Sequence, residues 1–549
     1  MLIILIAFFL LAVGLASSEV LRPDRQALVK ISVAGEADLT LIESAGVPVF
    51  ARLTGGDGLP YLLAGAAPDQ SWPRGLVATV LDPETAGATY VLAYVMPGRP
   101  IPAWYDYGAP LLDDGIRLLL RVSPQGAGKL AAAGVETQIL TMDPKPLRPM
   151  VASIGRSPLL GPDALVEEIL AQVDSVTVYS YTASLSGEWP VTVDSQPYTI
   201  ATRYNLSGEP IRKATRFVGE HLEELGLAVE YHQWEAEDYP NVIGELTGLV
   251  DPEQIFIIGA HLDDRPSGPV APGADDNASG ATATLIAADI LSRYLWNCTL
   301  RFAFWTDEEQ GLRGSGAYAQ RAYEQGEQIV GYLNLDMIGY NTPSSPPIIE
   351  LHADESLPET LVLAQLYADV VDTYAFSLLP EIVPSGIGAS DHASFWQYGY
   401  TAILGIEDLD DKNPDYHTVN DLLQNLDIPY MTDFVRASIG TFFHMSDCVC
   451  LPVNQPRMTW DPPSPVVDHA VAYTGTVSGT QPITYTWDFG GPGYGVDLDT
   501  ATPFFTYLDG GTYTVTLSLE NPCGSVQVAR QVEVTEHWYA FLPFVRLDR

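Results

Sequence analysis

The chain has 549 residues, of which 47% are apolar and 17% are charged, so it can build real cores and is not generally disordered. At about 150 residues per domain, this length predicts three or four domains. Acidic residues outnumber basic ones by 69 to 27, and the net charge of −42 repels phosphate backbones, so we expect no nucleic-acid partner.

The first element in chain order is an apolar run. Residues 1–18 have the length of a signal-peptide core and end in small residues, with a cleavage point at or just beyond Ala16, although a basic start is missing. The alternative is an uncleaved anchor, but the run is shorter than the roughly 20 residues that span a bilayer. We therefore predict a signal peptide and a secreted or extracellular protein, free or associated with the cell surface.

Residues 19–150 contain a weak internal repeat. A strand-like run beginning at Ala27, a short helix pattern and a second strand-like run recur in the same order from Arg117 onward. Two strand–helix–strand units predict a small α/β domain. A proline-rich stretch over 143–162 follows it and is typical of a linker. Such a domain is either a pro-segment or an accessory module, and the sequence leaves both open.

The pattern changes over residues 161–447, where apolar strand runs alternate with helix-length segments. Strands are predicted at 255–260, 300–305, 329–335 and 401–406, and helices at 209–225, 279–295, 315–325 and 357–371. This alternation predicts an α/β fold with a mostly parallel sheet flanked by helices on both faces. In such sheets, ligands bind beyond the carboxyl ends of the strands.

Residues 455–536 lose the helical patterns and show period-2 alternation with glycine turns, which predicts an immunoglobulin-like β-sandwich. The segments Tyr485-TWDFGG and Gly511-TYTVTL resemble the PKD domain found in secreted bacterial hydrolases. The resemblance implies contact with protein, polysaccharide or the cell envelope, and a spacer role is the alternative. Residues 537–549 form an aromatic-rich tail that is a final strand, a sorting signal or an anchor.

The four cysteines do not form a zinc-finger pattern. In an exported protein they allow one or two disulfides. Cys448 and Cys450 are too close in sequence to pair easily with each other, and the sequence does not say which partners they have.

Polar side chains follow the predicted strands of the middle region. His261 and Asp263 follow the first strand two residues apart, so on an extended chain they point to the same side. Asp275 and Asp276 lie in a glycine-bearing loop before a helix. The other candidates after strands are Glu308, Glu309, Asp336 and His417.

Each of these residues alone has an ordinary structural explanation, such as a loop histidine or a helix N-cap. Together, two histidines and at least three carboxylates are predicted to converge on one edge of one sheet. Imidazole and carboxylate are the ligands that a pair of zinc ions needs, and without cations so many acidic groups would repel one another.

The segments GAHLDD, PGADDNASG, DEEQGLRGS, NLDMIGY, SDHASFW and the stretch from His417 resemble the M28 family of zinc peptidases over roughly residues 195–445. The resemblance implies two zinc ions, one held by His261 and Asp336 and the other by Glu309 and His417. It further implies the following roles: Asp276 as the bridging ligand, Glu308 as the general base, Asp263 as the partner that orients His261, and Asp391 and His392 as structural residues near the substrate.

The chain departs from that family pattern at two places. Asp264 stands where many members have a small or hydroxyl residue, and no cysteine pair lies near 385–390. The second departure predicts that the substrate-side loop is held in another way.

The resemblance implies a zinc-dependent aminopeptidase that removes N-terminal residues from peptide or protein substrates, with Met337, Leu404 and Tyr416 suggesting an apolar pocket. A carboxypeptidase or dipeptidase of the same family is the main alternative, with Arg265 as the candidate that binds a terminal carboxylate. A cyclase-like transferase resembles a one-zinc site and fits five ligands poorly. A non-enzymatic surface protein would lack ligands, and none is missing. The ligand types also allow cobalt or manganese.

Overall fold

The computed structural model describes residues 26–67, 70–94, 104–123, 126–127, 129–130, 133, 135–147, 161–234, 239–266, 268–491, 495–496 and 499–536. The predicted signal peptide, the C-terminal tail and most of the proline-rich linker lie outside these residues. The chain divides into two compact units, residues 1–148 and 149–549. Among the described residues, no helix is both long and apolar enough to cross a membrane.

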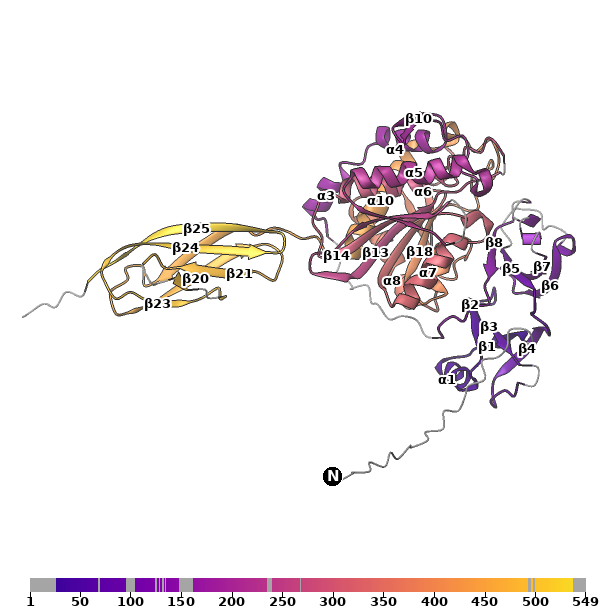
Figure 1. Ribbon diagram of the computed structural model, residues 1–549, viewed down its shortest axis with the longest axis horizontal. Coiled ribbons are helices and arrows are strands. Elements are labelled where there is room, and N and C mark those ends of the chain that lie inside the picture. The colour runs from indigo at the N-terminus through magenta and orange to yellow at the C-terminus, as the bar shows by residue number, and fades with distance from the viewer. Residues whose placement is uncertain are drawn as a thin grey trace, which may run out of the picture. The chain divides into compact units, whose positions relative to one another are not determined.

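The N-terminal unit contains two four-stranded antiparallel sheets (Figure 1). The first has the order β2-β3-β1-β4 and packs α1 (Glu36–Ala45) against its apolar face. The second has the order β6-β7-β5-β8. The strands are β1 (Ala27–Ser32), β2 (Val49–Thr54), β3 (Pro60–Ala66), β4 (Val77–Asp82), β5 (Thr89–Tyr94), β6 (Gly108–Asp113), β7 (Arg117–Val122) and β8 (Thr137–Leu140). The predicted strand runs are present, but β3 lies between β1 and β2, so the first repeat does not form a parallel pair.

An eight-stranded mixed sheet forms the centre of the second unit, in the order β11-β12-β14-β13-β15-β18-β16-β17. Its strands are β11 (Ala228–His232), β12 (Asn241–Leu246), β13 (Asp251–His261), β14 (Cys298–Trp305), β15 (Gln328–Leu335), β16 (Ile348–His352), β17 (Leu379–Val383) and β18 (Ala402–Glu407). The four strands predicted from the sequence are β14, β13, β15 and β18, and they pair in parallel at the centre. The pairs β11–β12, β12–β14 and β16–β18 are antiparallel, so parallel pairing is confined mainly to the centre.

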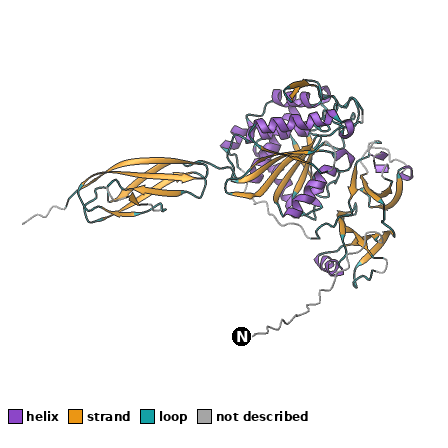
Figure 2. Cartoon of the chain, in the orientation of Figure 1, coloured by secondary structure: helices purple, strands orange, loops and turns teal. Residues whose placement is uncertain are grey.

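Helices cover both faces of this sheet (Figures 1 and 2), as the strand–helix alternation predicts. One apolar cluster joins the sheet to α3 (Ala164–Leu170), α4 (Ser175–Leu185), α5 (Glu209–Glu224), α6 (Ala278–Leu291), α8 (Pro358–Thr373) and α10 (Ile428–Ser446). The other face packs against α7 (Arg313–Gln325) and α9 (His392–Trp396). Helix α6 is buried along nearly its whole length because its alanine, glycine and threonine side chains let it approach its neighbours closely.

The C-terminal sandwich packs a sheet of order β19-β20-β23 against one of order β22-β21-β24-β25. Its strands are β19 (Asn454–Asp461), β20 (Ala470–Ser478), β21 (Thr484–Asp488), β22 (Gly495–Val496), β23 (Phe504–Thr506), β24 (Gly511–Asn521) and β25 (Gly524–Val534). Trp487 and Phe489, from the segment that resembles a PKD domain, are buried in its core beside Tyr473.

Two disulfides lie where the sandwich joins the preceding region. Cys298 pairs with Cys448, and Cys450 pairs with Cys523. Cys448 and Cys450 therefore do not pair with each other, as the spacing predicts. The first disulfide attaches the connecting segment to β14, and the second attaches it to the loop between β24 and β25.

Candidate metal centre

The side chains predicted to bind metal lie beyond the carboxyl ends of the central strands. His261 ends β13 in register with Trp305 at the end of β14, and Asp336 follows β15 directly. Glu308 and Glu309 lie in a short 3-10 helix just after β14, and the remaining two ligand candidates lie in the loops before α6 and after β18. The parallel register of the strands thus brings distant parts of the sequence to one edge.

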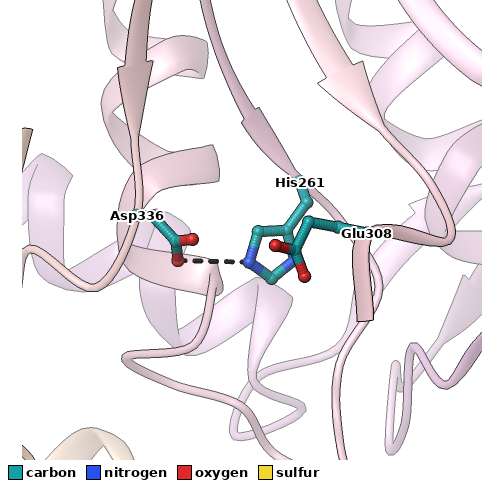
Figure 3. Close-up of side chains that lie close together, drawn as sticks. All are labelled: His261, Glu308 and Asp336. Atoms are coloured by element: carbon teal, nitrogen blue, oxygen red, sulfur yellow. Dashed lines mark hydrogen bonds and ion pairs between the residues drawn. The ribbon is translucent and has the colours of Figure 1, made fainter. Parts of the chain in front are cut away.

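One group consists of His261, Glu308 and Asp336, whose potential ligand atoms all lie within 4.8 Å of one another (Figure 3). His261 Nε2 lies 3.1 Å from Asp336 Oδ1. All three side chains are buried. An imidazole and two carboxylates aimed at one point make a suitable cation site.

The second group consists of Asp276, Glu309 and His417 and meets the same 4.8 Å limit. His417 Nε2 lies 3.1 Å from Asp276 Oδ2 and 3.1 Å from Glu309 Oε2. The other carboxylate oxygen of Asp276 lies 3.3 Å from His261 Nε2. Asp276 is therefore in contact with a histidine of each group, through one carboxylate oxygen to each.

Asp263 contacts His261 through its main chain rather than its carboxylate. His261 Nδ1 lies 3.0 Å from the Asp263 carbonyl oxygen and 3.9 Å from Asp263 Oδ1. The carboxylate instead accepts hydrogen bonds from the backbone N–H groups of Glu308 and Glu309, each at 3.2 Å. Asp263 thus fixes the turn that carries both glutamates, in addition to holding the imidazole of His261.

Two further side chains orient the ligand carboxylates. Ser390 donates its hydroxyl proton to Asp336 Oδ2 at 2.7 Å and accepts a hydrogen bond from the amide of Asn334 at 2.8 Å. Arg265 Nε lies 2.6 Å from Glu309 Oε2, and its guanidinium also donates to the Glu309 carbonyl. Hydrogen bonds of this kind fix the direction of metal ligands.

The loop that carries Asp276 is held by residues of the loop that carries His417. Asp421 accepts hydrogen bonds from the backbone N–H groups of Asp275 and Asp276, the shortest to each at 3.1 and 3.0 Å. Asn413 donates to Asp421 at 2.9 Å. Asp275 does not reach the metal groups and instead accepts a hydrogen bond from Gly339 N–H at 2.9 Å. The N-cap of α6 is Asn277, so Asp276 is not the capping residue and is available as a ligand.

Burial makes the charge at this site costly. It raises the pKa of Glu308 and of Asp263 well above their usual range, and it also raises the pKa of Asp336. Burial acts to lower the pKa of His261, but the charges of Asp336 and Glu308 outweigh it and raise that pKa well above its ordinary value. Buried carboxylates at this density favour a site that contains cations.

Asp276 behaves differently from its neighbours. Burial acts to raise its pKa, but hydrogen bonds to His261 and His417 outweigh burial and hold the pKa below its usual range. Asp276 therefore remains ionised more readily than Glu308 or Asp336. Glu309 Oε1 is buried and has no hydrogen-bond partner among the described residues, so this oxygen is available to coordinate a metal ion. The donor set of imidazole nitrogens and carboxylate oxygens fits zinc.

The backbone is strained around the same residues. The backbone φ angle is positive at three residues: 63° at Asp307, 50° at Met337 and 60° at His417. Residues other than glycine rarely adopt this left-handed conformation. Each is a site residue or lies next to one. Such strain is typical of functional sites, where the surrounding structure enforces a particular side-chain direction.

The other candidates take supporting positions. Asp391 and His392 belong to neither metal group, and both are fully buried at the start of α9. Met337 and Tyr416 are buried beside the ligands, and the Tyr416 ring stacks on His417 with centroids 3.6 Å apart. Leu404 is completely buried within β18.

The sequence did not predict the supporting roles of Arg265, Asp421 and Ser390. The only signal was their position near the ligands in the chain: Arg265 follows His261 by four residues, and Asp421 follows His417 by four. Hydrogen bonds to backbone N–H groups leave no pattern in a sequence, so this signal gives proximity without a role.

Two parts of the chain match known protein families. Residues 241–441 match the model of peptidase family M28, and residues 461–534 match that of the PKD domain. The chain is 31% identical over 199 residues to a probable leucine aminopeptidase of Arthroderma otae, covering 34% of this chain and 52% of that protein. It is 29% identical over 273 residues to leucine aminopeptidase 1 of Aspergillus fumigatus, covering 45% of this chain and 67% of that protein. The chain thus spans about half of the first relative's length.

Among solved structures, the LapA aminopeptidase of Legionella pneumophila is similar over 65% of this chain and 98% of LapA, with a TM-score of 0.51 and 18% identity. LapB from the same organism gives a TM-score of 0.51 and 18% identity. At this identity the likeness concerns the fold alone. The family models by themselves identify residues 241–441 with peptidase family M28 and residues 461–534 with the PKD domain.

Proposed function

We propose that this chain is a secreted, two-zinc aminopeptidase that removes N-terminal residues, preferably apolar ones, from peptides. The observation that carries the proposal is the pair of adjacent groups His261–Glu308–Asp336 and Asp276–Glu309–His417, with Asp276 in contact with the histidine of each. The leucine aminopeptidases to which the chain is similar support the same reaction class.

We assign His261 and Asp336 to one zinc ion, Glu309 and His417 to the other, and Asp276 to both. Bound zinc ions would supply Lewis-acid charge and would lower the pKa of a water molecule in the site toward neutrality. Ser390 and Arg265 hold the carboxylates of Asp336 and Glu309, so the ligand directions are set before a metal binds.

Glu308 is the proposed general base. It takes the proton from the attacking water and returns it to the leaving amine. Its position in the turn fixed by Asp263 supports this role, because both hydrogen bonds to that turn are made to backbone N–H groups and leave the Glu308 carboxylate directed at the site.

The charge around the site favours a free amino terminus over a free carboxylate. Buried carboxylates surround the site and attract an α-ammonium group, whereas they repel a terminal carboxylate. Arg265 is the residue that would bind the terminal carboxylate in a carboxypeptidase. Its guanidinium forms an ion pair with Glu309, so its charge is already balanced within the site. Both observations favour the aminopeptidase over the carboxypeptidase or dipeptidase. Met337 and Tyr416 beside the ligands support an apolar preference.

The regions outside the peptidase fit an extracellular enzyme. Two disulfides persist best outside the reducing cytosol, and they agree with the apolar run at residues 1–18. We propose that the PKD domain contacts protein, polysaccharide or the cell envelope. We further propose that residues 19–150 form a pro- or accessory domain, that 161–447 form the peptidase domain and that 455–536 form the sandwich.

The test is hydrolysis of leucine p-nitroanilide by the purified protein, beside the N-acetylated form of the same substrate. We expect cleavage of the free-amine substrate alone, loss of activity with a chelator and recovery on adding zinc. Cleavage of both substrates would contradict the exopeptidase assignment. If neither is cleaved, even after removal of residues 19–150, the aminopeptidase proposal is wrong and substrates with a free carboxyl terminus become the next test.

A further inference from the structure

Residues 384–391 connect β17 to α9 and carry Ser390, the residue that donates to Asp336. The segment is exposed at Pro384 and Ser385, partly buried at Gly386 and Ile387, and buried from Gly388 onward. It contains no cysteine, so no disulfide holds it. The backbone path of this segment nevertheless decides how the Ser390 hydroxyl meets the carboxylate of a proposed metal ligand.

Two buried histidines hold the main chain of Ile387 from both of its polar groups. The Ile387 N–H donates to His352 Nδ1 at 3.2 Å, and the Ile387 carbonyl accepts a hydrogen bond from His392 Nε2 at 2.8 Å. His352 is 2% exposed at the end of β16, and His392 is fully buried at the start of α9. The segment is therefore tied to two elements that are far apart in the sequence.

The surroundings of the two rings fix which nitrogen carries the proton. His352 Nδ1 must be unprotonated to accept from the Ile387 N–H, so the single N–H proton of the neutral ring lies on Nε2, which is 2.9 Å from Glu350 Oε2. His392 is neutral because burial lowers its pKa to about 3, and its Nε2–H faces the carbonyl. Each imidazole thus offers the one group that the Ile387 backbone needs.

Gly386 lets the chain pass close to His352. A Cβ at this position would lie 2.7 Å from His352 Cβ and 2.9 Å from the Ala353 carbonyl oxygen. The Gly386 N–H also donates to the Ala353 carbonyl at 2.8 Å. A side chain at this position would therefore push Ile387 away from His352.

We propose that His352 and His392 are positioning residues that clamp Ile387, fix the path of residues 384–391 and thereby set Ser390 against Asp336. The two hydrogen bonds restrain this segment, which contains no cysteine. The proposal rests on the proposed peptidase function only where activity is measured, since the clamp itself is a property of the free protein.

The test compares variants that remove each hydrogen bond with variants that keep it. His352→Leu and His392→Leu remove the ring nitrogens. His352→Asn places an amide oxygen near the Nδ1 position, and His392→Gln places an amide N–H near the Nε2 position. For each variant we would measure hydrogen–deuterium exchange in the metal-free full chain, and then kcat and KM for leucine p-nitroanilide with zinc added.

We expect both leucine variants to exchange about tenfold faster over residues 384–391 than the wild type, with other segments unchanged, and to lose roughly tenfold in kcat/KM. The asparagine and glutamine variants should restore both values toward the wild type. Wild-type exchange in the leucine variants, or equal behaviour of leucine and amide variants, would overturn the clamp. Faster exchange with unchanged kcat/KM would overturn its positioning role.

The exchange measurement separates this proposal from the proposed function, because it decides the clamp even if the wild-type protein cleaves no substrate. If a leucine variant does not fold, Gly386→Ala provides the same test, because its added Cβ would push Ile387 away from His352 while both histidines remain. Its matched control is Gly161→Ala, whose added Cβ meets no atom within 4 Å. Accelerated exchange over 384–391 in Gly386→Ala alone would support the clamp, and equal exchange in both variants would refute it.

Discussion

Arg203 and Asp264 form an ion pair at 3.5 Å in which both side chains are completely buried. Arg203 also donates to the main-chain carbonyls of Leu262, Pro272 and Gly273. It therefore ties the segment that follows His261 to the segment that precedes Asp276. This pair gives a structural role to the acidic residue at position 264, where the sequence departs from the common family pattern.

Replacing Arg203 by methionine should destabilise the fold by about 3–5 kcal/mol, because it leaves Asp264 buried without its counter-charge. Urea unfolding of the metal-free protein measures this change. The double variant Arg203→Met, Asp264→Ser should recover part of the loss, since it removes both charges. Arg457→Met, at an exposed position of the sandwich, is the control and should change stability by less than about 0.5 kcal/mol. A double variant no more stable than the single one would contradict this account.

Glu308→Gln should lower kcat at least about 100-fold and leave the bound zinc unchanged, because the amide cannot accept the proton from water but keeps the shape of the side chain. Activity assays and metal analysis of the dialysed protein measure the two effects separately. Glu253→Gln, at an exposed position on the strand that ends in His261, should behave as the wild type. Loss of zinc together with activity would show that Glu308 is a ligand rather than the base.

Replacing Cys450 and Cys523 by serine should destabilise the β-sandwich and leave the peptidase unfolding transition in place. The disulfide closes a separation of 73 residues, for which a loss of about 2–4 kcal/mol is expected. In a domain of this size, this corresponds to a fall in Tm of roughly 8 °C or more, measurable by calorimetry. The matched variant lacking Cys298 and Cys448 should instead lower the peptidase transition. The prediction is wrong if loss of Cys450 and Cys523 lowers the peptidase transition, or if loss of Cys298 and Cys448 lowers only that of the sandwich.

Acid should destabilise the peptidase domain through His392. Burial lowers the pKa of this imidazole to about 3, below its ordinary value of 6.5, so folding favours the neutral form. The contribution of His392 to the free energy of unfolding is fully present above pH 6.5 and is lost as the pH falls toward 3. His392→Gln keeps the donor to Ile387 but does not titrate. Between pH 6 and 4, its unfolding free energy should therefore fall less steeply, by about 1.4 kcal/mol per pH unit.

Unfolding of the metal-free protein at about pH 6.5, 5.5 and 4.5 measures this slope without competition between protons and metal. Parallel slopes for the wild type and His392→Gln would show that His392 titrates normally in the folded state.

The sequence by itself was sufficient to predict the central strands and the segments that carry the site. Apolar runs such as 255–260 and 329–335 are buried on both sides in a parallel sheet, and polar residues such as His261 and Asp336 follow them directly. This contrast is local, so it can be read along the chain. The alternating pattern of β21 and β24 likewise predicted the sandwich.

Tertiary structure alone decided which groups support the ligands and how the loops are held. The sequence predicts that Asp263 orients His261, and only the structure shows that its carboxylate accepts hydrogen bonds from the N–H groups of Glu308 and Glu309. The disulfide between Cys298 and Cys448 spans a separation of 150 residues, and the hydrogen bond from Ile387 to His352 spans 35. Such contacts are set by how strands and helices pack. A hydrogen bond to a backbone N–H or carbonyl demands nothing of the partner's side chain and so leaves no mark in the sequence.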